Sequence, residues 1–315
     1  MKKLLITRRL PDASLAAARA RYDLTLRDAA QGLTVDEAAD ALRNYDAILP
    51  TLGDQFTADA FTGPIRCGVL ANFGVGYNHI DVAAARAAGV SVSNTPDVVT
   101  DATADIGMTL ILSTCRRAGE GERLVRANDW SGWAPTQMLG THVTGKTVGI
   151  VGMGRIGQAV ARRCHYGFEM PVLFYNRSRK NVDLPARQVE TLAALMAQAD
   201  IIVVTVPGGG ANTGMISAEM LGAMKPGGIF INIARGDVVD EPALIAALQN
   251  GRIGGAGLDV FAKEPAVPNA LRALENVVLL PHLGTAALEI REAMGQMALD
   301  NIIAWDEGRT LPQAV

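Results

Sequence analysis

Short apolar runs alternate with longer amphipathic or alanine-rich stretches along the whole chain. In the first hundred residues, the apolar runs predict four strands of one small sheet, at 4–7, 47–50, 68–71 and 90–92. A second series predicts six further strands, at 147–151, 172–175, 201–206, 229–233, 255–259 and 277–280. Strands that alternate with helices are typical of an α/β protein whose sheets are parallel.

The helical stretches indicate how these two sheets divide the chain. A long helical segment begins at Thr100, and we expect either Thr100 or Asp101 to cap it. The last helix, at about 289–307, follows the last strand, and we expect it to return to the first sheet. The pattern therefore predicts a small flavodoxin-like domain, 1–97 with 287–315, and a Rossmann-type domain with a doubly wound parallel sheet, 98–286.

Composition and charge exclude several classes of protein. The chain has 315 residues, of which 49% are hydrophobic, and this is enough for two buried cores. A formal net charge of −3 gives no basic surface for nucleic acid or for an anionic membrane. No apolar stretch reaches the roughly 18 residues of a membrane span. The apolar run at 4–6 is also too short for a signal peptide.

The cysteines Cys67, Cys115 and Cys164 are an odd number, and they have neither metal-ligand nor CxxC spacing. We expect them to be buried thiols in a reducing cytoplasm. The sequence predicts no metal site.

A glycine-rich motif follows the predicted strand at 147–151 and opens a helical stretch. It consists of Gly152, Met153, Gly154, Arg155, Ile156 and Gly157. In this strand–turn–helix setting GxGxxG predicts a dinucleotide site. The first glycine makes a tight turn, the second admits the pyrophosphate, and the third lets the helix pack on the strand. The helix N-terminus offers N–H groups and a partial positive charge to the phosphates.

A second phosphate-binding pattern lies just before this motif, and we reject it. Residues 140–147 (GTHVTGKT) satisfy the expression GxxxxGK[ST], but their Lys-Thr pair runs into a strand instead of opening a helix. We therefore expect no ATP site there.

The turn after the strand at 172–175 indicates which nicotinamide cofactor is bound. An NAD-selective site normally places an Asp or Glu about 20 residues after the glycines, where it binds the ribose 2′-hydroxyl. The turn here begins 24 residues after Gly152 and consists of Asn176, Arg177, Ser178, Arg179 and Lys180. Two guanidinium groups and a hydroxyl suit a 2′-phosphate, so the turn favours NADPH, with NADH possible. The alternative is a basic turn that contacts only solvent.

His282 stands at the end of a predicted strand, where open α/β sheets bind their ligands. It belongs to an ordered set of motifs, at 72–81 (NFGVGYNHID), 94–96 (NTP), 100–105 (TDATAD), 231–240 (INIARGDVVD), 257–265 (GLDVFAKEP) and 281–282 (PH). Over nearly the whole chain these motifs resemble the D-isomer-specific 2-hydroxyacid dehydrogenases. Residues 138–140 (MLG), the glycine motif and 176–179 (NRSR) most resemble the glyoxylate/hydroxypyruvate reductase branch.

The resemblance implies an oxidoreductase that reduces small 2-keto acids, such as glyoxylate and hydroxypyruvate. Its first domain then binds the substrate and its second binds NAD(P). Arg235 anchors the substrate carboxylate and polarises the ketone, and His282 donates the proton to the ketone oxygen. Glu264 holds the imidazole and keeps it protonated near neutrality by opposite charge. The backbone N–H groups of Val75 and Gly76 bind the substrate carboxylate.

The resemblance also implies cofactor contacts beyond the glycine motif and the turn at 176–179. Asp259 is expected to accept a hydrogen bond from the nicotinamide amide. The other contacts share positions at or near strand ends, and they are Thr103, Val206, Pro207, Ile233, Ala234, Arg235, His282 and Gly284. At 206–210 (VPGGG) the chain departs from the residues usual in the family.

Members of the family are typically dimers through the cofactor domain. We expect a cytoplasmic homodimer whose contact includes the helix after Thr100 and the loop with Trp130, Trp133 and Pro135. The alternative is that these tryptophans belong to the core. A competing function is that of a dinucleotide-sensing corepressor of the same fold, although no basic or tail-like segment supports it.

Overall fold

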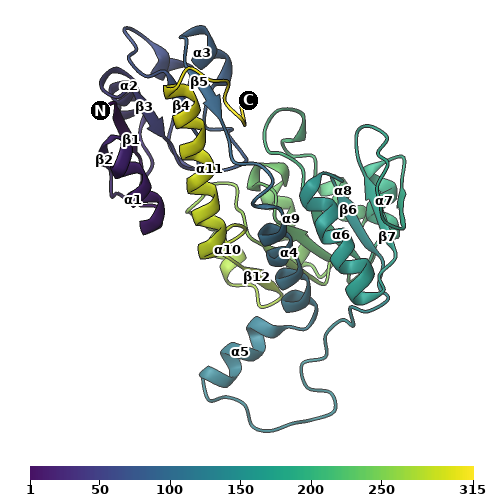
Figure 1. Cartoon of the computed structure of the whole chain (residues 1–315). Helices are drawn as coiled ribbons and strands as arrows, with labels where there is room; N and C mark the ends of the chain where they lie inside the picture. The colour runs from purple at the N-terminus through teal and green to yellow at the C-terminus, as the bar shows by residue number, and fades with distance from the viewer. The chain divides into compact units, whose positions relative to one another are not determined.

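A computed structural model describes all 315 residues, which form two compact units (Figure 1). The first unit consists of Met1–Val99 and Thr285–Val315, and the second is Thr100–Gly284. Each boundary lies two residues from the one that the sequence predicts.

The first unit contains a five-stranded parallel sheet in the order β2-β1-β3-β4-β5, which is the flavodoxin-like order. Its strands are β1 (Lys3–Ile6), β2 (Asp23–Leu26), β3 (Ala47–Leu49), β4 (Val69–Ala71) and β5 (Ser91–Ser93). The apolar pattern does not predict β2. This strand lies at the sheet edge and alternates exposed with half-buried residues, so it contains no apolar run.

Helices cover both faces of this sheet because successive strand residues point to opposite sides. Leu4 and Ile6 pack against α1 (Asp12–Arg21) and α11 (Leu288–Asp306), whereas Leu5 packs towards α2 (Val35–Asn44) and α3 (Val82–Ala87). A short 3₁₀ helix (Ala58–Phe61) completes the unit. The last helix of the chain is therefore part of the first unit, where the sequence places it.

The second unit contains a seven-stranded parallel sheet in the order β12-β11-β10-β9-β6-β7-β8. Its strands are β6 (Val148–Val151), β7 (Val172–Tyr175), β8 (Ala186–Gln188), β9 (Ile201–Val204), β10 (Ile229–Asn232), β11 (Gly255–Leu258) and β12 (Val277–Leu279). The chain runs outwards from β6 in both directions, which is the doubly wound arrangement predicted. The prediction of six strands is wrong by one, because β8 is a partly exposed edge strand with the sequence Ala-Arg-Gln.

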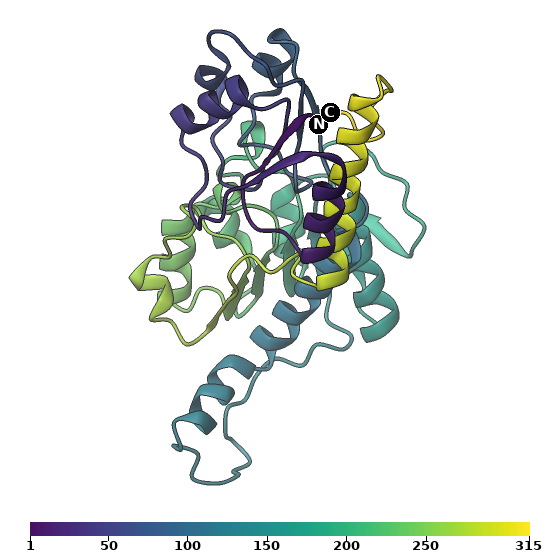
Figure 2. The same cartoon turned by 60° about the vertical axis from the view of Figure 1, so that its left-hand side comes forward.

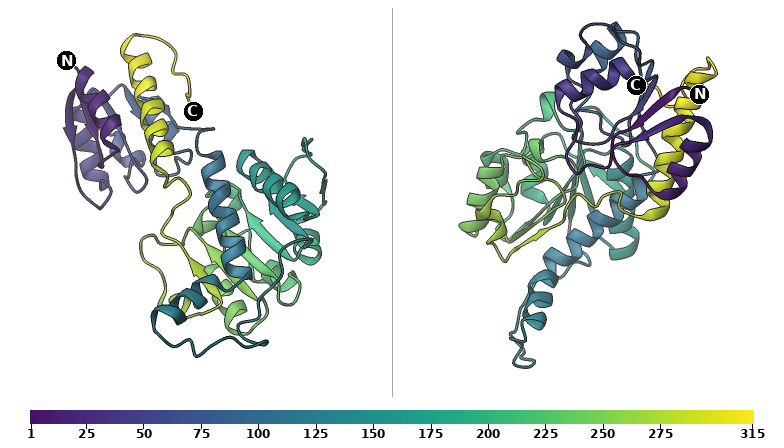
Figure 3. Two further views of the ribbon diagram at one scale, coloured as in Figure 1. Left: turned by 60° about the horizontal axis from the view of Figure 1, so that its bottom comes forward. Right: turned by 90° about the vertical axis from the view of Figure 1, so that its left-hand side faces the viewer.

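Helices also cover both faces of the second sheet (Figure 3). On one face lie α4 (Thr100–Cys115) and α6 (Arg155–Phe168), and on the other lie α7 (Leu192–Gln198), α8 (Ala218–Ala223) and α9 (Glu241–Gln249). Two 3₁₀ helices (Gly210–Asn212 and Gly236–Val238) and α10 (Asn269–Arg272) lie in the connections. Neither Thr100 nor Asp101 caps α4, since both already lie in its first turn, where Asp101 instead pairs with Arg163.

One helix of the second unit contributes nothing to its core. None of the residues of α5 (Ala118–Arg126) is buried, and the helix continues into a long loop that reaches β6. Figures 2 and 3 show α5 and this loop projecting from the sheet of their own unit. The tryptophans of the loop are not core residues, because Trp130 is 54% and Trp133 79% exposed.

The three cysteines are free and buried, as predicted. Burial raises the pKa of the Cys67 and Cys164 thiols to about 12 and that of Cys115 to about 11, so none of them is a thiolate near neutrality. No helix of the chain combines the length and the apolar character that a membrane crossing requires.

Candidate active site

The carboxyl ends of the second unit's parallel strands meet at one edge of the sheet, where doubly wound folds bind their ligands. Most of the predicted site residues of this unit directly follow a strand. The glycine motif follows β6, the basic turn follows β7, Val206 and Pro207 follow β9, Arg235 follows β10, Asp259 follows β11 and His282 follows β12. The topology thus brings together residues that are more than a hundred positions apart in the sequence.

The glycine motif has the geometry of a phosphate-binding turn. Gly152 has a φ of +97°, and a Cβ there would lie 2.6 Å from Cγ1 of Val206. A Cβ at Gly157 would lie 2.2 Å from the carbonyl oxygen of Gly152, so only glycine lets α6 pack this closely on the turn. Gly154 precedes α6, and a Cβ there would meet no atom within 4 Å. The motif is therefore tightly packed on the protein side and open at its middle glycine.

Some residues that the sequence predicts to contact the cofactor can do so only through their backbone, because their side chains are buried. The Met153 side chain is fully buried in the core beneath α4 and α6, and Ile233 and Ala234 are also buried. The rejected pattern at 140–147 ends just before β6, where the Thr147 N–H donates to Asp200 and no helix follows.

His282 and Glu264 form a close pair of titratable groups at this edge. Nδ1 of His282 lies 2.8 Å from Oε2 of Glu264, and the two side chains are 29% and 30% exposed. The other carboxylate oxygen of Glu264 accepts a hydrogen bond from the Phe261 N–H at 3.0 Å. Because a carboxylate can only accept, Nδ1 of the imidazole carries the proton in this pair, which leaves Nε2 for another partner.

The backbone of His282 is held in an unusual conformation. Its φ is +56°, in the left-handed region that residues other than glycine seldom adopt. Asp259, which is 2% exposed, accepts from the next two N–H groups, those of Leu283 at 2.6 Å and Gly284 at 2.8 Å. Thr103 on α4 donates to the Gly284 carbonyl at 3.1 Å. These three bonds fix the segment that carries the imidazole.

Asp259 and Thr103 therefore have a contact that sequence reasoning does not anticipate. The sequence assigns Asp259 to the nicotinamide amide, but both of its oxygens bind backbone N–H groups within the chain. Burial raises the pKa of Asp259, whereas the bonds from Leu283 and Gly284 and the charge of His282 oppose this rise. A contact with the nicotinamide stays a prediction for both residues.

Arg235 stands at the end of β10 in a loop that Asn232 shapes. The Asn232 amide accepts from the Ala234 N–H and donates to the Arg235 carbonyl, both at 3.0 Å. A Cβ at Gly208 would lie 2.7 Å from both Cγ of Arg235 and Oδ1 of Asp237, so glycine is needed there. The unusual segment 206–210 thus makes room for the arginine. Asn232 and Gly208 are site residues that no sequence motif predicts.

The charges at this edge act on one another. Burial raises the pKa of the Glu264 carboxyl, but three neighbours outweigh the effect of burial and bring this pKa below its ordinary value. They are His282, through its hydrogen bond and charge, the Phe261 N–H, and the charge of Arg235. Burial lowers the pKa of the Arg235 guanidinium against the opposing charges of Glu264 and Asp237. Near neutrality the cluster therefore contains an ionised carboxylate and a charged guanidinium.

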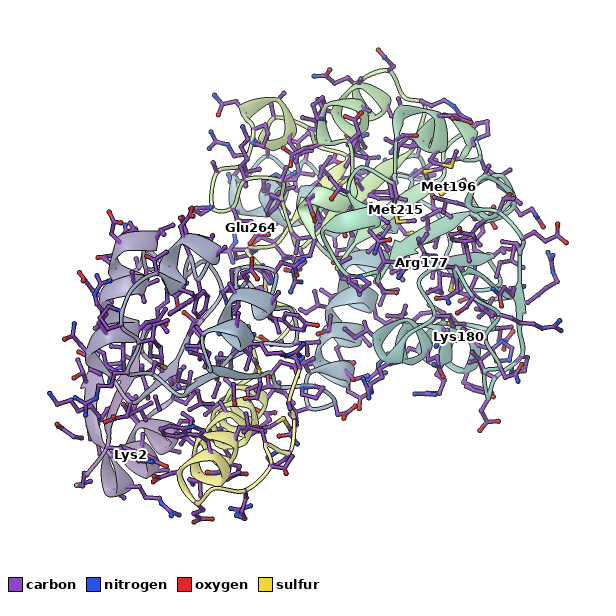
Figure 4. All side chains as sticks on the ribbon, turned by 90° about the horizontal axis from the view of Figure 1, so that it is seen from above. Lys2, Arg177, Lys180, Met196, Met215 and Glu264 are labelled. Atoms are coloured by element: carbon purple, nitrogen blue, oxygen red, sulfur yellow. The ribbon has the colours of Figure 1, made fainter.

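The basic turn after β7 is exposed to solvent. Arg177 and Lys180 both belong to this turn (Figure 4), and neither they nor Arg179 forms an ion pair within the chain. The Asn176 amide donates to the carbonyl of Ser178 at 3.1 Å and to its hydroxyl at 3.3 Å. Three cationic side chains without an ion-pair partner thus lie at the position where this fold binds the adenine ribose.

The loop after β4 in the first unit has its carbonyl groups satisfied and two N–H groups free. Asn72 donates to the carbonyls of Gly74 and Gly76, and Asn94 donates to that of Val75. The Val75 and Gly76 N–H groups have no acceptor within the chain. This arrangement can bind an anion through the backbone.

Comparisons with known proteins agree on one family. A family model described as "D-isomer specific 2-hydroxyacid dehydrogenase, NAD binding domain" matches residues 108–284. A glyoxylate reductase from Pyrococcus furiosus is 39% identical over 99% of this chain and 95% of its own length. A glycerate dehydrogenase from Hyphomicrobium methylovorum is 36% identical over 100% of this chain and 99% of its own.

A solved structure adds the same likeness in three dimensions. It is an NADPH-dependent glyoxylate/hydroxypyruvate reductase from Sinorhizobium meliloti in complex with NADP and malonate. It shares 34% identity and a TM-score of 0.88, and the match covers 100% of this chain and 96% of that one. This chain therefore belongs to the family of D-isomer-specific 2-hydroxyacid dehydrogenases, as its ordered motifs predict.

Proposed function

We propose that this chain is an NADPH-preferring reductase of small 2-keto acids, with glyoxylate and hydroxypyruvate as its substrates. The observation that carries the proposal is the His282–Glu264 pair, which stands at the same sheet edge as Arg235 and the glycine motif. The relatives named glyoxylate reductase and glycerate dehydrogenase, which act on 2-keto and 2-hydroxy acids, support this class of substrate.

In this proposal His282 is the proton donor. Its Nδ1 is occupied by Glu264, so Nε2 delivers the proton to the ketone oxygen during reduction and takes it back during oxidation. Glu264 acts in two ways, because it fixes the ring by one oxygen while the Phe261 N–H holds the other. Its negative charge also favours the imidazolium form.

Arg235 and the loop after β4 bind the substrate in this proposal. The planar guanidinium of Arg235 suits a carboxylate and stabilises negative charge that develops on the ketone oxygen. In the first unit, the free N–H groups of Val75 and Gly76 bind the carboxylate of the substrate. Asp259 and Thr103 position the segment that carries His282.

The second unit fits a nicotinamide dinucleotide. Its residues include an open Gly154 before α6 and a turn with three unpaired cations. We expect Gly154, Arg155 and Ile156 to hold the pyrophosphate at the N-terminus of α6, and Arg177, Ser178 and Arg179 to hold the 2′-phosphate. When bound, this cofactor supplies the hydride for the reduction.

We also propose that the chain is a cytoplasmic homodimer. The sequence places the contact on the helix after Thr100 and the loop with Trp130, but about half of the residues of α4 are buried within its own unit, so we assign the contact to α5 and the loop after it. This segment exposes Val125, Trp130, Trp133 and Leu139, with exposed fractions between 54% and 79%. Large apolar side chains gathered on one projecting segment are typical of a protein–protein contact.

A dinucleotide-sensing corepressor is the competing function, and the site argues against it. Such a protein has no need of an imidazole held by a carboxylate beside an arginine. The test is the loss of NADPH absorbance when glyoxylate or hydroxypyruvate is added, with the His282→Asn variant as control. Dinucleotide binding without turnover of either acid would contradict the proposal.

A further inference from the structure

The basic turn after β7 is held in shape by a side chain on the neighbouring strand. Gln188 is the last residue of β8, and it lies opposite Phe174 in the register of β7 with β8. Its amide nitrogen donates to the carbonyls of Asn176 at 3.2 Å and Ser178 at 3.1 Å. Its amide oxygen accepts from the Lys180 N–H at 3.0 Å. One side chain therefore contacts the start, the middle and the end of the turn.

These bonds need a neutral amide. Gln188 uses both its donor and its acceptor on the backbone of the turn, and only a side chain with both groups can do this. A glutamate at this position could not donate to the two carbonyls, and it would place a negative charge beside the turn. A leucine would leave all three backbone groups without this partner.

The surroundings show what the ordered turn presents. The turn and β8 line an open hollow of about 750 Å³, which contains four basic side chains and Glu190 as its one acid. The basic residues are Arg177, Arg179, Lys180 and Arg187. Asn176, where an NAD-selective site has its carboxylate, points its amide back to Ser178. The backbone of the turn is thus bonded internally, while three of its side chains remain free for an anion.

We infer that Gln188 is a positioning residue that determines cofactor selectivity, because it pre-organises the turn for the ribose 2′-phosphate. The inference rests on the NADPH preference proposed above. Ordering a loop before the ligand binds removes a free-energy cost from the binding step. The benefit applies to the ligand that uses the turn, which is the 2′-phosphorylated one, and much less to one with a free 2′-hydroxyl.

The test uses two fragments that differ only in this phosphate. Binding of 2′,5′-ADP and of 5′-AMP to the whole protein is measured by calorimetry for the wild type, Gln188→Leu and Gln188→Glu. We expect Q188L to weaken 2′,5′-ADP about tenfold and 5′-AMP less than about twofold, because three hydrogen bonds of the turn are lost. Q188E keeps the size of the side chain but cannot donate to the two carbonyls, and it adds repulsion, so it weakens 2′,5′-ADP further.

A matched control is Gln198→Leu, whose amide bonds Arg187 and the Ala194 carbonyl but not the turn. This control should leave the ratio of the two affinities unchanged. Kinetics give a second measurement, in which Q188L raises the KM for NADPH while kcat at saturating NADPH stays close to that of the wild type.

The outcomes separate this inference from the proposed function. A wild type that binds 5′-AMP as tightly as 2′,5′-ADP contradicts the NADPH preference and, with it, the role of Gln188. A wild type that prefers 2′,5′-ADP, with the same preference in Q188L and Q188E, overturns only the inference. Equal weakening of both fragments also overturns it, since Gln188 would then act on folding alone.

Discussion

The Glu264→Gln variant tests how a carboxylate sets the protonation of its neighbour. The change preserves the size of the side chain, and the amide oxygen can still accept from the Phe261 N–H, as Oε1 of Glu264 does at 3.0 Å. What it removes is the negative charge 2.8 Å from Nδ1 of His282, together with the acceptor of the Nδ1 proton, because the amide nitrogen then faces the ring. Any change in the pH profile therefore reports the loss of this charged acceptor and not a loss of packing.

The sign follows from the lowered pKa of Glu264. The bond and charge of His282 contribute to that lowering, so the pair favours the charged forms of both partners. The variant should therefore move the basic limb of the pH profile to lower pH. Both side chains are about 30% exposed, so solvent screens the pair and the displacement is smaller than it would be for a fully buried pair.

The assay is kcat/KM for glyoxylate reduction as a function of pH, at saturating NADPH. The basic limb of the profile should move to lower pH in E264Q. A matched control is Glu241→Gln, since Glu241 accepts from the Ala262 N–H in the same loop but does not touch His282. A basic limb that stays in place in E264Q, or moves to higher pH, would refute the reasoning.

Four further predictions concern catalysis, cofactor, assembly and stability. His282→Asn should lower kcat by about 10²–10⁴-fold and leave NADPH binding nearly intact; near-normal turnover removes His282 from the mechanism. Replacing Arg177 and Arg179 by serine should raise the KM for NADPH about 10²-fold and make it less sensitive to salt, while an unchanged KM would mean that the turn contacts only solvent. Sedimentation at micromolar concentration should show a dimer that Val125→Ser with Trp133→Ser converts to monomer; a monomeric wild type contradicts this. Burial raises the pKa of Asp200, but Lys225 and the Thr147 N–H outweigh burial and bring it below the ordinary 3.8. Asp200→Asn should therefore lower the free energy of unfolding by about 1–2 kcal/mol at neutral pH. Urea unfolding should show that this difference between variant and wild type disappears as the pH falls below 3.8. A difference that persists in acid contradicts the assignment.

The apolar pattern predicted the buried strands well because they are covered on both faces. All four residues of β6, β9, β10 and β11 are buried, and such strands appear in the sequence as continuous apolar runs. The edge strands β2 and β8 are half exposed, and their polar sequences contain no such run. Yet β8 carries Gln188, so one of the two strands that the pattern misses is the strand that holds the basic turn.

Sequence motifs identified the charged groups of the site but not the residues that support them. The family resemblance pairs Glu264 with His282, and their side chains lie within hydrogen-bonding distance in the structure. The backbone partners of Asp259 and the space that Gly208 provides depend on contacts between distant segments, which no local pattern encodes. Asn72 and Asn94 donate hydrogen bonds to the carbonyl groups of the loop around Val75. The sequence indicates such a role only weakly, because each asparagine stands just after a predicted strand.

The left-handed backbone of His282 limits how this position can be studied or can change. A saturation library at residue 282 would mix two effects, because most side chains at a φ of +56° add strain of about 1–3 kcal/mol to any loss of chemistry. Asparagine, aspartate and glycine tolerate this conformation, and β-branched residues tolerate it least. An inactive valine variant would therefore say little about proton transfer. The same restriction limits the single substitutions by which a descendant of this chain could replace His282 and still keep its fold.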